Sequence, residues 1–185
     1  MSLLATPDRV ARMFIGLPVP EQTRGKLAEI ARGRYGEYFE KLVPEGNWHM
    51  TLFFLGNVRN PGQYIGRLEQ PMPQTFVPTL TLTHIGRGEP RDQLWAYGLP
   101  AKGLLDLRAA IGKRLGKIRF PHPVGAKKFT PHIRLANMYP TVRSMGVADT
   151  PVREAYAIRE AYLYSSSNKA SHVGSQYTIE ATIRF

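Results

Sequence analysis

The chain has 185 residues, of which 43% are hydrophobic, so it can fill the core of one or two small lobes. It has no cysteine, which excludes disulfides and thiolate catalysis, and no apolar run near the roughly 18 residues that span a bilayer. The formal net charge of +11, from 25 Lys+Arg against 14 Asp+Glu, favours an anionic ligand. Residues 1–8 are too few and too polar for a secretory signal, so we expect a cytoplasmic protein with no membrane partner.

Strand-like runs are expected to alternate with two helices. The first run, at 12–19, precedes a helix that opens near Pro20, because proline suits the first helical turn. A second run, at 94–99, precedes a helix whose apolar stripe has a spacing of three and four, made by Leu104, Leu107, Ile111, Leu115 and Ile118. Further strands are predicted at 79–86, 152–165 and 176–185, with a loop at 165–175.

Two short histidine motifs begin strands of their own, WHMTLFFLG at 48–56 and FTPHIRLA at 129–136. Because side chains alternate across a strand, His49 and Thr51 share one face, as do His132 and Arg134. The residues predicted to face a core instead are Met50, Leu52, Phe54, Ile133 and Leu135. Two strands that each carry an imidazole and a donor are therefore predicted to meet across a cleft.

The two halves of the chain repeat one order of elements. Each histidine motif follows an apolar run and a helical pattern, and 83 residues separate His49 from His132. Similar order without similar sequence indicates an old duplication. We therefore predict one domain, 1–185, with an α+β fold: a two-lobed pseudo-twofold duplication with a mainly antiparallel sheet in each lobe, helices outside and a central cleft.

Basic residues concentrate in the second half. From Leu107 to Ala148 there is no Asp or Glu, and the stretch contains nine Lys and Arg residues beside the second motif. A surface of one charge near a cleft attracts a ligand of the opposite charge, and a polynucleotide supplies many phosphates. The alternative is a solvated basic helix without a ligand.

Two facing histidines suit a reaction that needs an acid and a base together, and phosphodiester cleavage is the standard example. The competing uses of histidine find less support. No spacing of histidines and acidic residues around His49 or His132 provides three metal ligands. No nucleophile elbow and no Walker-type loop occurs, so we expect neither a metal nor another cofactor. The other histidines are interpreted as strand packing (His84), a turn (His122) and a loop (His172).

These residues resemble the 2H phosphoesterase superfamily, and within it the RNA 2',3'-cyclic phosphodiesterase branch, also called 2'-5' RNA ligases. NWHMTLFFLG at 47–56 is similar to the first family motif, and FTPHIRLA at 129–136 to the second. MFIGLP at 13–18 is similar to the first strand of the family, and GSQY at 174–177 to its closing Gly-x-x-Tyr segment. The resemblance implies catalytic roles for His49 and His132. The sequence leaves open which is the acid and which is the base; we take His49 as the acid and His132 as the base.

Three positions depart from the family pattern. The second motif is His-x-Arg where relatives have His-x-Thr/Ser, and Asn137 stands where many carry an arginine. Thr51 and Arg134 are therefore expected to bind the phosphate, with Arg134 supplying charge that relatives supply from the later position. Phe53 is expected to face the cleft, where relatives often have a basic residue, and to contact a nucleobase.

The resemblance implies hydrolysis of 2',3'-cyclic phosphate ends of RNA to 2'-phosphate ends, without a metal, and reversible 2'-5' ligation without ATP. The expected partner is RNA with such ends or a related nucleotide, and a monomer is favoured. Two alternatives stay open. One is a catalytically weak RNA-binding protein on the same scaffold, and the other is a phosphodiesterase for small cyclic nucleotides or 2'-5' oligoadenylates.

Overall fold

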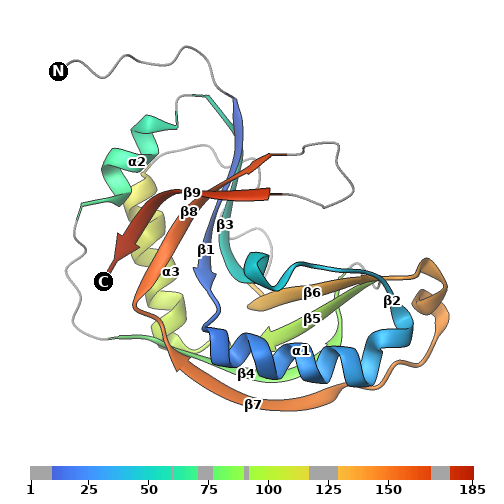
Figure 1. The fold of residues 1–185 in the computed structure, drawn as a ribbon. Coiled ribbons are helices and arrows are strands. Elements are labelled where there is room, and N and C mark those ends of the chain that lie inside the picture. The colour runs from blue at the N-terminus through green and yellow to red at the C-terminus, as the bar shows by residue number, and fades with distance from the viewer. Residues whose placement is uncertain (1–9, 60, 71–76, 90–91, 117–128, 168–175) are drawn as a thin grey trace.

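The computed structural model describes residues 10–59, 61–70, 77–89, 92–116, 129–167 and 176–185 (Figure 1). These residues form an α+β fold of one large antiparallel sheet and three α-helices. No helix in these ranges is long and apolar enough to cross a membrane. The strands are β1 Ala11–Pro18, β2 Phe39–Leu42, β3 His49–Val58, β4 Thr79–Arg87, β5 Gln93–Gly98, β6 His132–Met138, β7 Thr150–Ala157, β8 Glu160–Ser167 and β9 Gln176–Arg184. The helices are α1 Glu21–Tyr35, α2 Gly62–Leu68 and α3 Lys102–Leu115. The α+β class confirms the sequence prediction, which named two of the helices, α1 and α3.

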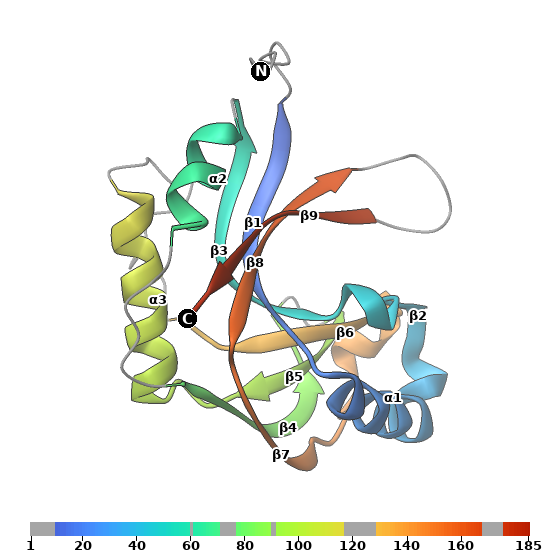
Figure 2. The same cartoon turned by 60° about the vertical axis from the view of Figure 1, so that its left-hand side comes forward.

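The strand order is β7-β4-β5-β6-β3-β1-β8-β9, with β2 paired to β6 beside this path. We name β3, β1, β8 and β9 the β3 half, and β6, β5, β4 and β7 the β6 half. The order reads symmetrically about the β6–β3 pair: each half runs outward from a histidine-bearing strand through the strand that precedes its helix. The strands β3 and β1 run in a different direction from β6 and β5 in both views (Figures 1 and 2).

The expectation of a separate sheet in each lobe is corrected by one hydrogen-bonded path that joins the halves. Within the described residues, β3 and β6 are matched at one position, Met50 opposite Ile133. The connection is short because β2 occupies the rest of that edge of β6, from Ala136 to Met138. The sheet is therefore continuous, but the pairing between its two halves is short at the point where the two motifs meet.

The helices that connect paired strands pack on the opposite half of the sheet. Helix α1 leaves β1 but packs beside β4 and β7, where the Tyr35 hydroxyl donates to the carbonyl of Ile85 and contacts Thr150 Oγ1 (2.9 and 2.8 Å). Helix α3 leaves β5 but packs against β3, where Arg108 Nε donates to the carbonyl of Leu52 (3.2 Å). The predicted stripe of α3 is buried at Leu104, Leu107, Ile111 and Leu115, while Ile118 lies outside the described residues.

The predicted strand at 152–165 is wrong as one element, because it is two strands in different halves. β7 ends at Ala157 and β8 begins at Glu160, and the chain crosses between the halves at Ile158 and Arg159. The side chain of Ile158 is buried and its N–H donates to the carbonyl of Pro78 (2.8 Å). Residues 155–158 are all apolar, and the range 152–165 contains no Gly, Pro, Asn or Asp, so the sequence carried no turn signal there.

Candidate active site

A cleft of about 480 Å³ lies where the two halves meet. Its walls include His49 and Thr51 from β3, and His132 and Arg134 from β6. The structure therefore brings together the four residues that the motifs predict. A second hollow, of about 680 Å³, lies against β9 and contains neither histidine, so we assign the chemistry to the smaller cleft.

His49 is the first residue of β3, and hydrogen bonds define its ring orientation. Its Nδ1–H donates to the carbonyl of Asn47 (2.7 Å), and because a carbonyl only accepts, Nε2 is the nitrogen that carries the lone pair. The Thr51 hydroxyl donates to Nε2 (3.1 Å). The ring stacks on Phe14 of β1, with centroids 4.6 Å apart. A Cβ at Gly16 would lie 3.0 Å from His49 Cδ2, so glycine allows β1 to approach the imidazole.

His132 repeats this arrangement on β6. It is the first residue of its strand, and its Nδ1–H donates to the carbonyl of Thr130, again two residues upstream (2.9 Å). Its ring stacks on Trp95 of β5, with centroids 3.6 Å apart and planes 15° from parallel. Each imidazole is thus fixed by a backbone carbonyl and by an aromatic ring of the neighbouring strand, and each presents Nε2 for chemistry.

Both imidazoles are harder to protonate than a free histidine. Burial lowers the pKa of His49 to about 4, and the positive charges of Arg134 and of protonated His132 act in the same direction, against the hydrogen bond to Asn47. Burial also lowers the pKa of His132, with Arg134 again adding to the effect and the bond to Thr130 opposing it. In the free protein both rings are therefore neutral near pH 7.

A β-bulge follows each histidine by three residues. Ile15 is opposite Phe53 and Gly16 is opposite Thr51, so Leu52 is the extra residue of β3. Leu94 is opposite Ala136 and Trp95 is opposite Arg134, so Leu135 is the extra residue of β6. A bulge reverses the face of the residues after it. The alternation predicted from the sequence therefore holds up to each bulge and fails beyond it.

The prediction that Phe53 faces the cleft is wrong, and the bulge at Leu52 is the reason. The side chain of Phe53 is 4% exposed and contacts α3, where Arg108 lies 4.8 Å from its ring centroid. Phe54, which alternation places toward the core, is instead 53% exposed and lines the cleft. By the same shift Asn137 lies opposite Gln93, a cleft residue, on the face that carries Arg134.

Sequence reasoning missed the aromatic and basic side chains that complete the cleft. They are Arg12 and Phe14 of β1, Trp95 of β5 and Tyr177 of β9. Tyr177 meets the His49 ring edge-on at 5.4 Å. The sequence signal for Phe14 and Trp95 was their position in the strand that precedes each helix. That signal becomes readable only when the pairing of β1 with β3, and of β5 with β6, is known.

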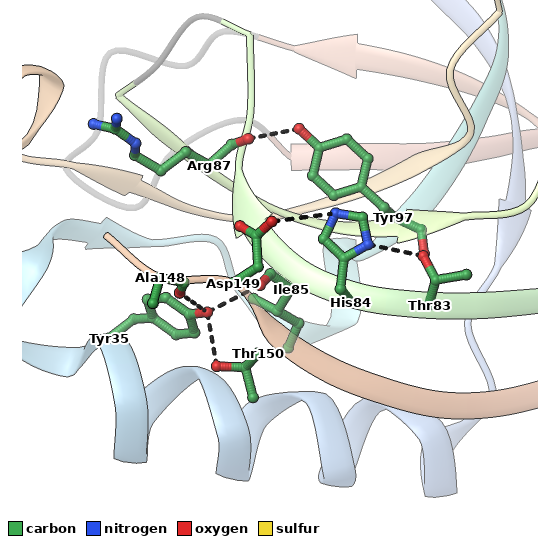
Figure 3. Close-up of polar contacts among 9 residues, drawn as sticks. All are labelled: Tyr35, Thr83, His84, Ile85, Arg87, Tyr97, Ala148, Asp149 and Thr150. Atoms are coloured by element: carbon green, nitrogen blue, oxygen red, sulfur yellow. Dashed lines mark hydrogen bonds and ion pairs between the residues drawn. The ribbon is translucent and has the colours of Figure 1, made fainter. Parts of the chain in front are cut away.

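The other histidines lie apart from the cleft or outside the described residues. His84 of β4 stacks on Tyr97 at 4.5 Å, contacts the Thr83 hydroxyl through Nδ1 and lies 3.9 Å from Asp149 (Figure 3). This agrees with its interpretation as a strand packing residue. His122 and His172 fall outside the described residues. Within the described ranges, no three His, Cys, Asp or Glu side chains are grouped closely enough to hold a metal ion.

Comparison with known proteins identifies relatives over most of the chain. The RNA 2',3'-cyclic phosphodiesterase of Thermus thermophilus is 31% identical over 137 residues, which cover 68% of this chain and 67% of the relative. The crystal structure of TT0787, also from Thermus thermophilus, superimposes with a TM-score of 0.72 at 25% identity, covering 94% of this chain and 97% of that one. E. coli LigT complexed with NADP+ gives a TM-score of 0.70 at 25% identity, with the same coverage. No family model matches the chain.

The lowered pKa of His49 predicts a pH dependence of stability. Between pH about 4 and 6.5 the unfolded chain binds more protons at this position than the folded chain, so the free energy of unfolding falls as the pH falls. His49→Asn should remove a contribution on the order of 3 kcal/mol from the change between pH 7 and pH 4. Urea unfolding at several pH values measures it. An identical pH slope in the variant and the wild type would show that burial does not disfavour the charged ring.

Proposed function

Because the chain belongs to the RNA 2',3'-cyclic phosphodiesterase family of 2H phosphoesterases, we propose that it hydrolyses the 2',3'-cyclic phosphate ends of RNA to 2'-phosphate ends. The observation that carries the proposal is the pair of imidazoles in one cleft, each with Nδ1–H bonded to a backbone carbonyl and Nε2 left for proton transfer. Two such groups supply a base and an acid for one displacement at phosphorus.

In the proposed reaction His132 Nε2 removes a proton from water, and the resulting hydroxide attacks phosphorus. The bond from phosphorus to the 3'-oxygen breaks, and His49 donates a proton to that oxygen. The products are a 2'-phosphate and a free 3'-hydroxyl. Thr51 and Arg134 contact the non-bridging oxygens, where negative charge develops. In the ligation a 5'-hydroxyl takes the place of water: its oxygen bonds to phosphorus, the bond from phosphorus to the 3'-oxygen breaks, and that oxygen takes up a proton. The strained cyclic phosphate supplies the energy, so this direction requires no ATP.

The acid role of His49 depends on the bound phosphate. With a pKa of about 4 in the free protein, His49 is neutral near pH 7. A phosphate anion bound beside the ring favours the imidazolium, so its charge opposes the effects of burial and of Arg134. Substrate binding and protonation of His49 are therefore coupled: the substrate supplies the charge that makes the ring an acid.

Two other functions are distinguished from the proposed one by an assay of the reaction products. A catalytically weak RNA-binding protein is favoured by Arg134, which stands where relatives have Thr or Ser. Such a protein would bind RNA without turnover. A phosphodiesterase for small nucleotides is favoured by the LigT relative, whose structure holds NADP+. Purified protein is incubated with RNA ending in a 2',3'-cyclic phosphate, with cyclic mononucleotides and with 2'-5' oligoadenylate, and the products are identified.

Loss of either histidine should abolish turnover. We expect His49→Ala and His132→Ala each to lower kcat by at least about 10²–10⁴-fold, the usual contribution of one acid-base group. Activity should persist in excess chelator. A cyclic substrate with sulfur in place of the 3'-oxygen needs less acid assistance, so it should rescue the variant that lacks the acid, His49→Ala, and not the other. Near-normal turnover in either alanine variant would exclude the two-histidine mechanism.

Arg134 should act chiefly on the transition state. Arg134→Ala should lower kcat by about 10- to 1000-fold, on the scale of one lost oxyanion donor, with a smaller effect on KM. Arg134→Lys should recover only part, because an ammonium cannot form two parallel bonds to phosphate oxygens.

The bulge at Leu135 provides a matched test of the same residue. Arg134→Thr alone restores the family residue but leaves no guanidinium, so its kcat should stay low. Adding Asn137→Arg places a guanidinium on the cleft face, opposite Gln93, and should recover activity above either single variant. Wild-type kcat in Arg134→Ala would show that the side chain does not reach the phosphate.

Phe54, not Phe53, should stack on a nucleobase. Phe54 is exposed in the cleft, and its ring lies 6.2 Å from Phe14, which stacks on His49. Base–aromatic stacking contributes about 1–3 kcal/mol. Phe54→Ala should therefore raise KM for a nucleotide substrate by about 5- to 100-fold, with little change in thermal stability. Phe53→Ala should instead reduce stability, since its ring is buried. The opposite pattern would return the base contact to Phe53.

A further inference from the structure

The indole of Trp95 lies between the imidazole of His132 and the backbone of Gly88. Its ring faces His132 at 3.6 Å on one side. On the other side, a Cβ added at Gly88 would collide with the indole atoms Cε2, Cδ2 and Nε1. Gly88 follows β4, and its N–H donates to the carbonyl of Gln93 (2.8 Å), which closes the β4–β5 connection over the ring. The indole of Trp95 is therefore packed closely between the His132 ring and the Gly88 backbone.

Further contacts hold the indole in its plane. Trp95 Nε1–H donates to Gln93 Oε1 (2.9 Å), and the side chain is only 8% exposed. The next ring on the same face of β5, Tyr97, stacks on His84 and donates its hydroxyl hydrogen to the carbonyl of Arg87 (2.5 Å; Figure 3). These contacts connect β5 to β4 on both sides of Trp95, and they favour the orientation in which the indole faces His132.

We propose that Trp95 is a positioning residue for the proposed reaction, and that it fixes the His132 ring and stabilises the imidazolium that forms when His132 takes a proton. The face of an indole attracts a cation more strongly than that of a phenyl ring. His49 has the phenyl ring of Phe14 at 4.6 Å, so the closer and more favourable stack belongs to His132. The kinetic part of this inference rests on the proposed function, whereas the stack itself does not.

Other charged or titratable groups surround His132 and share its electrostatic environment. Within the described residues they are Arg134 on its own strand, His49 across the junction, Tyr97 opposite it on β5, and Glu89 in the cleft wall. Arg134 disfavours the imidazolium, as does burial. In the proposal, the indole face is a favourable contribution that opposes both.

Kinetics tests the role of the ring. In Trp95→Leu the limb of the pH–kcat/KM profile that is set by His132 should move to lower pH by about 0.5–1 unit, with a fall in kcat of about 10-fold or more. Trp95→Phe should lie between Trp95→Leu and the wild type. Gly88→Ala, which displaces the indole, should reproduce the fall in kcat. Gly146→Ala, where an added Cβ meets open space, should leave kcat unchanged. An unshifted limb in folded Trp95→Leu would overturn the proposal.

Fluorescence tests the stack without substrate and without changing Trp95. The chain has two tryptophans, so Trp48→Phe leaves Trp95 as the sole indole emitter. A protonated imidazole quenches a stacked indole, and emission should fall on acidification from pH 7 to pH 4. Adding His132→Asn should remove that titration. A titration that survives His132→Asn, or its absence with His132 present, would overturn the proposal. An intact titration in a protein without hydrolase activity would support the stack and contradict the proposed function.

Discussion

The contact of Met50 with Ile133 sets the geometry of the whole site. Both side chains are fully buried, and each is the residue immediately after a histidine. Because side chains alternate along a strand, packing this pair into the core turns both imidazoles to the opposite face. Burial of two such side chains contributes about 1.5–3 kcal/mol each. The same apolar contact therefore joins the halves of the sheet and keeps His49 and His132 facing one cleft.

The crossed helices explain why this junction can be so short. Helix α1 ties β1 to the β6 half through Tyr35, whose hydroxyl contacts groups on β4 and β7 (Figure 3). Helix α3 ties β5 to the β3 half through Arg108 and its buried stripe. Each half is thus held to the other by a helix that crosses the junction, and the cleft needs few hydrogen bonds across its floor. The cleft lined by both histidines lies at this short junction.

Alternation predicted the shared face of each motif, helical periodicity predicted the stripe of α3, and the preference of proline for the first helical turn predicted the helix that opens near Pro20. They could not predict Phe54 or Asn137, because an extra residue in a strand leaves no mark in a pattern of apolar and polar positions. Leu52 and Leu135 are apolar like the residue that follows each of them, Phe53 and Ala136, and all four are buried. The crossing at Ile158 was hidden for the same reason. The sequence predictions are therefore wrong where the backbone geometry changes but the pattern of hydrophobic residues does not.

The two bulges also show how one scaffold accommodates different residues at equivalent places. Phe54 follows His49 by five residues, and Asn137 follows His132 by five, and both lie on the cleft face of their strands after the bulge. One wall therefore presents an aromatic ring and the other an amide, beside Arg134. Because the halves repeat the imidazole, the carbonyl acceptor and the bulge, the differences between the walls lie in the side chains that follow. In the proposed reaction this asymmetry distinguishes the base end of the substrate from its phosphate end, since two identical walls would bind it equally well in either orientation.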